Sequence, residues 1–399
     1  MRVQFIALLL IFQIKSSHAF APIPINKKSV SLSLMNGATI NGEEKIQTDV
    51  VDIPETIRQE ALTQFDEIMD HYMFELGNEM TFLTNQKEAS TYIYQNFDTL
   101  LLDCDGVLYR GTDAVPGVAS ALQSWMKAGK KLLFVTNNAG SNRKQLGDKL
   151  QKVLGVEDLT VDQMVSSSYA AARYLQKSLL ENDKDKLKDS SPPNVHVIGT
   201  SGLCNELRDS GFRVTSGEET DPAGMSREDL ASYSFHEEES DSKKVDAVVV
   251  GLDTDFSYRK LCIANVLLQR HPEAVFVATN EDAFDLVGAD ARHLPGNGAL
   301  VKAIEHASQR KAVNVGKPSP ILAELLREEH GLDLSRTLMV GDRLDTDVRF
   351  GKDSGMKSAL VMTGCTTADA LIGVGVGSTE EPLPHMILPY IGLIGMNEE

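Results

Sequence analysis

The chain has 399 residues, enough for two or three domains and for a core that needs no disulfide or metal to stabilise it. It carries 39 basic and 57 acidic residues, and the resulting formal net charge of −18 disfavours binding to the phosphate backbone of a nucleic acid. Its four cysteines are scattered without a CxxC pair, so neither a disulfide framework nor a cysteine zinc site is indicated.

The N-terminus has the composition of a targeting sequence. The positive residue Arg2 precedes the apolar segment 5–14 and a few small residues, which predicts a signal peptide over residues 1–19. Residues 20–40 begin with Phe20-Ala21-Pro22, are rich in Ser and Lys and predict a transit-like segment. The tandem resembles the bipartite presequence of algae with secondary red plastids, such as diatoms, and implies the chloroplast stroma; the secretory pathway is the alternative. No later apolar run can cross a bilayer, so no stable membrane anchoring is expected.

Residues 41–95 are predicted to form a helical extension without a chemical motif. Beyond them, short apolar runs alternate with segments of helical character. Runs that are apolar on both faces predict buried parallel strands in an α/β protein. Eight such runs are many for one sheet, so we expect a core with an inserted second α/β unit. The runs cover residues 99–102, 132–135, 195–198, 247–250, 274–277, 313–315, 338–340 and 359–361, and two polar stretches, 181–193 and 216–244, are predicted to be surface loops.

Chemically distinctive residues follow four of the runs. If these strands are neighbours in one sheet, the residues converge at its carboxyl edge, where open parallel sheets bind ligands. Carboxylates there would bind a hard cation such as Mg²⁺, and the lysine and the hydroxyl and amide groups would bind a phosphate. The four segments are Asp103-Cys104-Asp105-Gly106, Thr136-Asn137-Asn138, Gly316-Lys317-Pro318 and Gly341-Asp342-Arg343-Leu344-Asp345-Thr346-Asp347.

The first segment indicates a mechanism. Asp103 and Asp105 are two residues apart on an extended segment, so both side chains are expected on the same side. Asp103 is then placed to attack phosphorus, and Asp105 to protonate the leaving alkoxide and later deprotonate a water molecule. An isolated DxD pair is usually an acidic turn, but four motifs in this order, each after a strand, favour phosphoryl transfer.

These motifs resemble the haloacid dehalogenase-like phosphatases with a C2-type cap, the branch of the 4-nitrophenylphosphatases, phosphoglycolate phosphatases and pyridoxal phosphatases. The resemblance implies a Rossmann-like parallel-sheet core with an inserted α/β cap. Residues 96–160 and 296–399 would form the core and 161–295 the cap, through which a homodimer is possible. The matching segments are DCDGVLYRG at 103–111, FVTNNAGSNR at 134–143, VGKPSP at 315–320 and GDRLDTDV at 341–348, with cap-like segments at 248–261 and 278–304.

The resemblance also implies a role for each matching residue. Asp103 would be the nucleophile and a Mg²⁺ ligand, and Asp105 would be the acid/base, which touches the metal through its backbone carbonyl. Asp342 would be the third metal ligand, and Asp347 a supporting carboxylate. The phosphate would be bound by Thr136, Asn137, Asn138 and Lys317.

The cap would decide the substrate. Asn280, Asp282 and Asp285 are candidates for a specificity loop, although a polar loop without substrate contact is an equal alternative. Pyridoxal phosphatase places a histidine at the position that matches Asp285, and this difference counts against a pyridoxal phosphate enzyme.

The resulting hypothesis is a Mg²⁺-dependent phosphatase that converts 2-phosphoglycolate and water to glycolate and phosphate in photorespiration. Alternatives are a broader 4-nitrophenylphosphatase-like enzyme and a phosphatase for pyridoxal phosphate, glycerol phosphate or a nucleotide. A catalytically silent binding protein on the same fold is disfavoured because Asp103, Asp105, Lys317 and Asp342 are all present. A dehalogenase is disfavoured because it needs no second aspartate. A nucleotide-dependent dehydrogenase or kinase is disfavoured because the sequence contains neither a GxGxxG nor a GxxxxGK[ST] motif.

Overall fold

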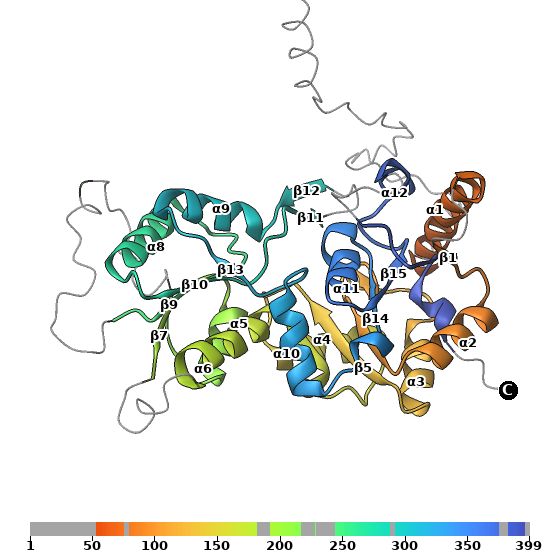
Figure 1. Ribbon diagram of the computed structural model, residues 1–399, viewed down its shortest axis with the longest axis horizontal. Helices are drawn as coiled ribbons and strands as arrows, with labels where there is room; N and C mark the ends of the chain where they lie inside the picture. Colours follow the sequence, from red (N-terminus) through yellow and green to blue (C-terminus); the bar gives the residue numbers. More distant parts are fainter. Residues whose placement is uncertain are drawn as a thin grey trace, which may run out of the picture. The chain divides into compact units, whose positions relative to one another are not determined.

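The computed structural model describes residues 53–75, 80–181, 192–216, 228, 244–287, 292–374 and 382–395. The predicted signal peptide, the predicted transit-like segment and most of the two predicted polar loops lie outside these ranges. Figure 1 shows the described helices and strands. No described helix is both long and apolar enough to span a membrane.

The first sheet has seven strands in the order β1-β16-β15-β14-β2-β5-β6, and all of its pairings are parallel. The two central strands, β14 and β2, are buried at every position, as expected for strands with both faces covered. The strands are β1 Thr81–Phe82, β2 Thr99–Leu102, β5 Lys131–Thr136, β6 Met164–Ser166, β14 Thr337–Gly341, β15 Lys357–Val361 and β16 Met386–Leu388.

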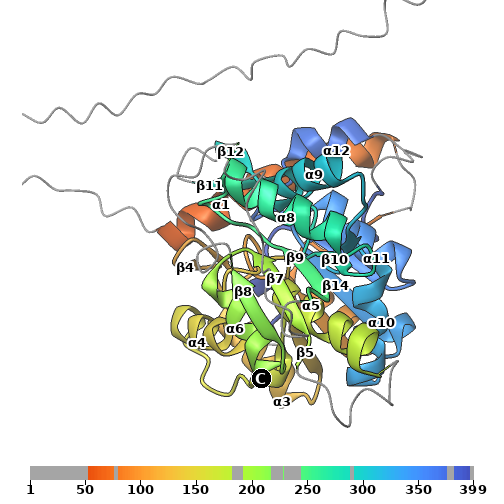
Figure 2. The same ribbon diagram turned by 90° about the vertical axis from the view of Figure 1, so that its left-hand side faces the viewer.

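The second sheet has five parallel strands in the order β13-β10-β9-β7-β8. Alternate residues of β9 face opposite sides: Val248 and Val250 join one apolar cluster with α8 and α9, and Ala247 and Val249 join another with α5 and α6. Figure 2 shows these two helix layers on opposite sides of the strands. The strands are β7 Asn194–Ile198, β8 Arg213–Ser216, β9 Ala247–Val250, β10 Val275–Ala278 and β13 Val313–Asn314.

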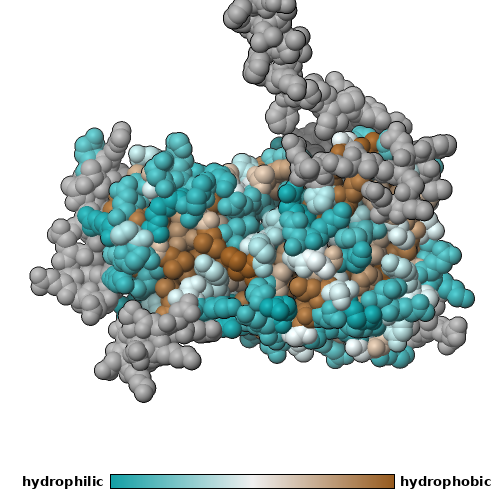
Figure 3. Space-filling model, in the orientation of Figure 1, coloured by the Kyte–Doolittle hydropathy of each residue, from teal (hydrophilic) through white to brown (hydrophobic). Residues whose placement is uncertain are grey.

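Helices and two small hairpins complete the described part. The hairpins are β3 (Tyr109–Arg110) with β4 (Asp113–Ala114), and β11 (Phe284–Val287) with β12 (Arg292–Pro295). The helices named here are α1 Ile53–Glu75, α2 Gln86–Asn96, α3 Val118–Lys127, α4 Arg143–Leu154, α5 Ser167–Leu175, α6 Ser201–Asp209, α8 Tyr258–Arg270, α9 Asn297–Ser308, α10 Pro320–His330, α11 Arg349–Asp353 and α12 Ala368–Val374. The face in Figure 3 is mainly hydrophilic, with apolar residues interspersed, which is ordinary for a folded chain.

The fold class is confirmed, and all eight predicted runs contain strands, but two predicted boundaries differ from the structure. β6 belongs to the first sheet, although the cap was predicted to begin at residue 161. β13 belongs to the second sheet, although the core was predicted to resume at residue 296. Therefore only three of the four motif-bearing strands are neighbours in one sheet. A short apolar run shows that a strand forms, but the partner of that strand depends on residues far away in the chain.

The described part of the predicted extension 41–95 is integrated into the core. Helix α1 buries Ala61, Phe65, Ile68 and Tyr72, whose spacing of four, three and four residues places them on one face of the helix. This face packs in the cluster that also contains residues after β14 and on β15. Strand β1 pairs with β16 at the edge of the first sheet. This segment thus contributes to the first sheet and to the apolar cluster packed against it.

Candidate active site

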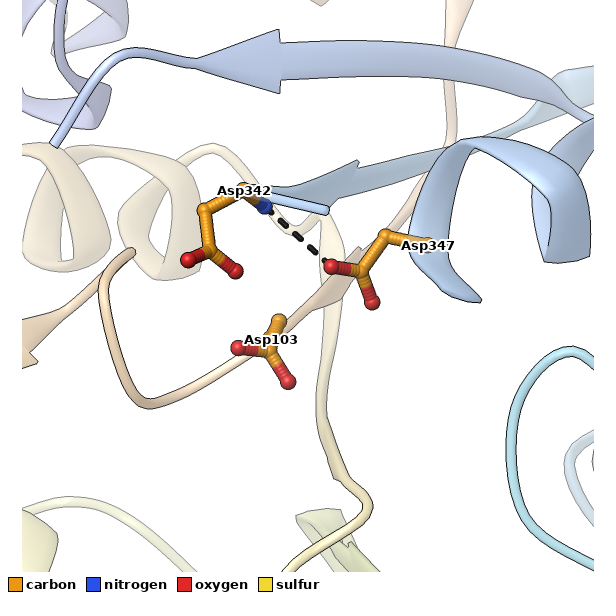
Figure 4. Close-up of side chains that lie close together, drawn as sticks. All are labelled: Asp103, Asp342 and Asp347. Atoms are coloured by element: carbon orange, nitrogen blue, oxygen red, sulfur yellow. Dashed lines mark hydrogen bonds between the residues drawn. The ribbon is translucent and has the colours of Figure 1, made fainter. Parts of the chain in front are cut away.

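Three aspartates converge at the carboxyl edge of the first sheet. Asp103 directly follows β2, and Asp342 directly follows β14, the strand beside it. The Asp103 amide donates to Val340 O at 2.9 Å, which continues the strand pairing up to the site. Asp347 lies in the short π-helix Leu344–Val348, and its Oδ2 accepts from the Asp342 amide at 3.2 Å. Figure 4 shows the three carboxylates around one point.

The arrangement of these carboxylates suits a metal ion. Each offers an oxygen that lies within 4.8 Å of the others, and all three side chains are buried. Sequence reasoning treated Asp347 as a supporting residue and Asp105 as a backbone ligand. The side-chain cluster in the described residues contains Asp347 and not Asp105. A set made only of oxygen donors fits a hard divalent cation such as Mg²⁺.

Lys317 is the cation that faces this cluster. Its Nζ lies 2.5 Å from Asp103 Oδ1 and 2.7 Å from Asp347 Oδ1, and it donates to Val135 O at 2.9 Å. Only 2% of Lys317 is exposed. Burial alone would lower the pKa of its ammonium group, but the carboxylates of Asp103 and Asp347 outweigh burial and raise the pKa. Lys317 therefore stays charged.

One lysine does not balance three buried carboxylates. Burial raises the pKa of Asp103 well above its usual range, with Lys317 opposing and Asp347 and Asp342 adding to the rise. Burial also raises the pKa of Asp342 to about 7, and repulsion from Asp347 adds to this effect. A site with this much uncompensated negative charge favours a bound cation.

The loop after β5 was predicted to bind phosphate, and in the structure the side chain of one of its residues is bound by other protein groups. The side chain of Asn137 accepts from the Lys317 amide at 2.8 Å and donates to Lys317 O at 3.1 Å and to Asp282 Oδ1 at 2.8 Å. Its side chain therefore fixes two protein loops and has no free donor for a phosphate. Thr136 Oγ1 accepts from the Asn138 amide at 3.1 Å, and Asn138 Oδ1 accepts from the Gly140 amide at 2.8 Å, so both define the shape of this loop.

Asp105 has surroundings unlike those of Asp103. Its side chain is 54% exposed, and its Oδ2 accepts from the Tyr109 hydroxyl at 3.1 Å. Lys149 Nζ lies 3.9 Å from its Oδ1. An exposed carboxylate beside a buried metal-type cluster can exchange protons with a reacting group.

A loop after β15 closes the site, and sequence reasoning missed it. The Cys365 amide donates to Asp342 Oδ2 at 2.6 Å, and the Thr363 hydroxyl donates to Gly106 O at 2.5 Å. A Cβ at Gly364 would lie 1.8 Å from Asp342 Oδ2, so only glycine fits there. Gly106 adopts φ +84°, and a Cβ there would lie 2.4 Å from the same oxygen. The available signal was a glycine just after a predicted strand.

Comparisons with known proteins place this site in a family. A family model described as haloacid dehalogenase-like hydrolase matches residues 100–213, and a second model of the same hydrolase type matches residues 314–390. Phosphoglycolate phosphatase 2 of Arabidopsis thaliana is 38% identical over 283 residues, which cover 71% of this chain and 88% of that protein. The chain belongs to the haloacid dehalogenase-like hydrolases.

Other relatives of this haloacid dehalogenase-like hydrolase are also named phosphatases. The chloroplastic phosphoglycolate phosphatase 1A of Arabidopsis thaliana is 36% identical and is covered over 75% of its length, with 72% of this chain aligned. A glycerol-3-phosphate phosphatase of Gallus gallus is 37% identical, with 72% of this chain and 86% of that protein aligned. The structure of a Mycobacterium tuberculosis glycerol phosphate phosphatase in complex with magnesium matches with a TM-score of 0.57 at 26% identity, covering 76% of this chain and 78% of that chain. The chain is a phosphatase of this family.

In the candidate specificity loop of the phosphatase, Asn280 and Asp282 make hydrogen bonds within the protein. Asn280 donates to Asn137 O at 2.8 Å, and its Oδ1 accepts from the Asp282 amide at 3.1 Å. Burial raises the pKa of Asp282 to about 6, against the opposing charge of Arg343 and the hydrogen bond from Asn137. Asn280 and Asp282 thus connect the segment after β10 to the loop after β5. Burial also raises the pKa of Asp285, on β11, with Arg343 opposing and the charge of Asp105 adding to the rise.

Arg343 links the metal-type cluster of the phosphatase to the β11–β12 hairpin, and sequence reasoning gave it no role. Its Nη1 donates to Phe284 O at 3.0 Å, and its guanidinium carbon lies 5.0 Å from the centre of the Phe284 ring. Asp345 binds Nε and Nη2 at 3.1 and 3.0 Å. A residue next to Asp342 therefore holds the hairpin that carries Asp285.

Proposed function

We propose that this phosphatase hydrolyses 2-phosphoglycolate to glycolate and phosphate, in a Mg²⁺-dependent reaction that passes through an aspartyl-phosphate. The observation that carries the chemistry is the buried cluster of Asp103, Asp342 and Asp347 with Lys317. The phosphoglycolate phosphatases among the relatives support the substrate. The chloroplastic relative and the presequence-like N-terminus support a role in the plastid, where photorespiration generates 2-phosphoglycolate.

In this proposal Asp103 is the nucleophile. One of its oxygens forms a bond to phosphorus while the bond from phosphorus to the ester oxygen breaks. Lys317 would offset negative charge on Asp103 and on the phosphoryl group. Asp103, Asp342 and Asp347 would hold Mg²⁺, which supplies positive charge to the phosphoryl oxygens.

Asp105 would be the general acid and base. It gives a proton to the ester oxygen as that oxygen departs. In the second half-reaction it takes a proton from the water whose oxygen attacks phosphorus, and the bond between Asp103 and phosphorus breaks. The proton count is restored at the end of the cycle, and Asp103 is regenerated.

Glycerol phosphate is the second candidate substrate. A relative of nearly equal identity and a solved structure with the same overall fold are both named for glycerol phosphate. The two substrates differ in the group attached to the phosphate: one carries a carboxylate and the other neutral hydroxyls. Discrimination between them must therefore depend on charged or polar residues of the cap and the rim of the site.

A phosphate-release assay tests the proposal. The protein used is residues 41–399, freed of metal with EDTA. It is assayed over a Mg²⁺ titration with 2-phosphoglycolate, glycerol 3-phosphate, pyridoxal phosphate and 4-nitrophenyl phosphate. We expect kcat/KM for 2-phosphoglycolate to exceed that for the other natural esters at least ~10-fold and to vanish without Mg²⁺. Equal or greater kcat/KM for glycerol 3-phosphate would assign the enzyme to the second substrate, and Asp103→Asn controls for contaminating phosphatases.

A further inference from the structure

Tyr109 is attached to Asp105 at two points. The Gly106 amide donates to Tyr109 O at 2.8 Å, which closes the turn that follows Asp105. The Tyr109 hydroxyl donates to Asp105 Oδ2 at 3.1 Å. The tyrosine itself is only 1% exposed and packs in the main apolar cluster of the first domain. A rigid, buried side chain thus makes a hydrogen bond to an exposed carboxylate.

The phenol of Tyr109 can donate at neutral pH, because a tyrosine hydroxyl ordinarily ionises at about pH 10.

The second oxygen of Asp105 is left available. Lys149 Nζ lies 3.9 Å from Oδ1, beyond hydrogen-bond length, and 4.0 Å from the centre of the Tyr109 ring. Among the described residues, no hydrogen bond to Oδ1 is present. The two carboxylate oxygens of Asp105 therefore differ: Oδ2 accepts the hydrogen bond from Tyr109, and Oδ1 is available to exchange a proton.

We propose that Tyr109 is a positioning residue for the acid/base, and that it orients the Asp105 carboxylate so that Oδ1 exchanges the proton with the leaving group. This inference rests on the proposed role of Asp105. A carboxylate that is 54% exposed otherwise samples several rotamers, only some of which reach the ester oxygen. The hydrogen bond to Oδ2 restricts that sampling, and well-oriented acid/base groups contribute roughly 10²–10⁴-fold to rates.

The test is the kcat/KM of Tyr109→Phe for two substrates with different leaving groups. This quantity reports steps up to phosphorylation of Asp103 and not the later attack of water. An alkyl ester such as 2-phosphoglycolate needs its leaving oxygen protonated, whereas 4-nitrophenolate does not. We expect a drop of ~10-fold for 2-phosphoglycolate and less than ~2-fold for 4-nitrophenyl phosphate. Phenylalanine fills the same volume, so the core is preserved.

Two further variants separate the possible results. Tyr72→Phe removes another buried hydroxyl, which donates to Leu371 O at 2.9 Å. This variant should not change the ratio of the kcat/KM values for the two substrates. In an Asp105→Asn background, Tyr109→Phe should have no further effect on either substrate. The inference about Tyr109 would be overturned if Tyr109→Phe lowered kcat/KM equally for both substrates, raised it, or still changed it in the Asp105→Asn background. The proposed role of Asp105 would stand in each of these cases. If Asp105→Asn itself shows no dependence on the leaving group, the proposed role of Asp105 fails as well.

Discussion

Lys317 and Asp103 form an ion pair across two sheets. Asp103 follows the central strand β2 of the first sheet, whereas Lys317 follows β13, an edge strand of the second, and their charged atoms lie 2.5 Å apart. Asn137 completes the connection, since its side chain holds the backbone of Lys317 on both sides of the residue. The site is therefore assembled from residues that follow strands of both sheets, and the position of Lys317 depends on the second sheet.

Replacement of the nucleophile should separate activity from stability. Asp103→Asn preserves the shape of the side chain but removes the attacking carboxylate, so kcat should fall by several orders of magnitude. It also removes one of three mutually repelling carboxylates, while Lys317 keeps Asp347 and Val135 O as partners. The metal-free variant should hence unfold at a temperature no lower than wild type in calorimetry. A variant with a tenth of wild-type kcat would contradict the nucleophile assignment.

Magnesium titrations should distinguish Asp342 from Asp105. Asp342 belongs to the buried cluster, so Asp342→Asn should weaken Mg²⁺ binding, and high Mg²⁺ should partly restore activity. Asp105→Asn should bind Mg²⁺ nearly as wild type but lose roughly two to four orders of magnitude in rate. Rescue of Asp105→Asn by Mg²⁺, without rescue of Asp342→Asn, would reverse the two roles.

Asn137 should be more important for stability than its neighbour. Asn137→Ala leaves the buried Lys317 amide without its partner and the half-buried Asp282 without a donor, and should cost about 2–3 kcal/mol. Asn138→Ala is the matched control because that residue is exposed and its side chain accepts only from Gly140. Urea unfolding of both variants measures the difference. Equal losses would show that the Asn137 contacts with Lys317 and Asp282 do not stabilise the protein.

His385 should make the protein less stable in mild acid. Its Nδ1 accepts from the Ser358 amide at 3.1 Å, and burial, with Lys357 and Lys352 nearby, lowers the pKa of the imidazole to about 4. Unfolded histidine has a pKa of about 6.5, so between about pH 6.5 and 4 the unfolded chain takes up a proton that the folded chain does not. The stabilisation is thus complete above about pH 6.5 and is lost as the pH falls. Since the ring is only partly buried, solvent screening reduces this effect, and we expect a loss of about 1–2 kcal/mol.

The His385 prediction has a direct control. His385→Asn retains an acceptor near the position of Nδ1 but does not titrate. The difference in unfolding free energy between wild type and this variant, measured in urea at about pH 7.5 and about pH 5, isolates the contribution of His385 from that of the other acidic and basic groups. A difference that does not change with pH would remove His385 as the cause.

The predicted presequence can be tested in a diatom-like host. Residues 1–40 fused to a fluorescent protein should reach the plastid stroma, because the apolar segment 5–14 and the following transit-like segment act in sequence. Phe20→Ala should leave the fusion inside the secretory membranes but outside the stroma. Microscopy that shows equal stromal import of both fusions would remove the basis for the plastid assignment.

The sequence by itself determined the local chemistry. Asp103 and Asp105, or Asp342 and Asp347, are close in the chain and follow apolar runs, and the end of a buried parallel strand is where such side chains meet a ligand. For this reason the fold class, the eight strands and the acidic cluster around Asp103 and Asp342 could be predicted from one chain. The spacing of residues along a strand or turn carries this information without reference to the rest of the molecule.

Only the tertiary structure decided which distant groups meet. The sequence predicted β13 as a strand, but only the structure shows that β13 pairs with β10, so that Lys317 reaches the site from the second sheet. The side chain of Asn137 is bound by Lys317 and Asp282, residues that lie far away in the chain. Arg343 gained its contact in the same way, through Phe284 of β11. Strand pairing and hydrogen-bond partners depend on non-local packing, which no single segment of sequence encodes.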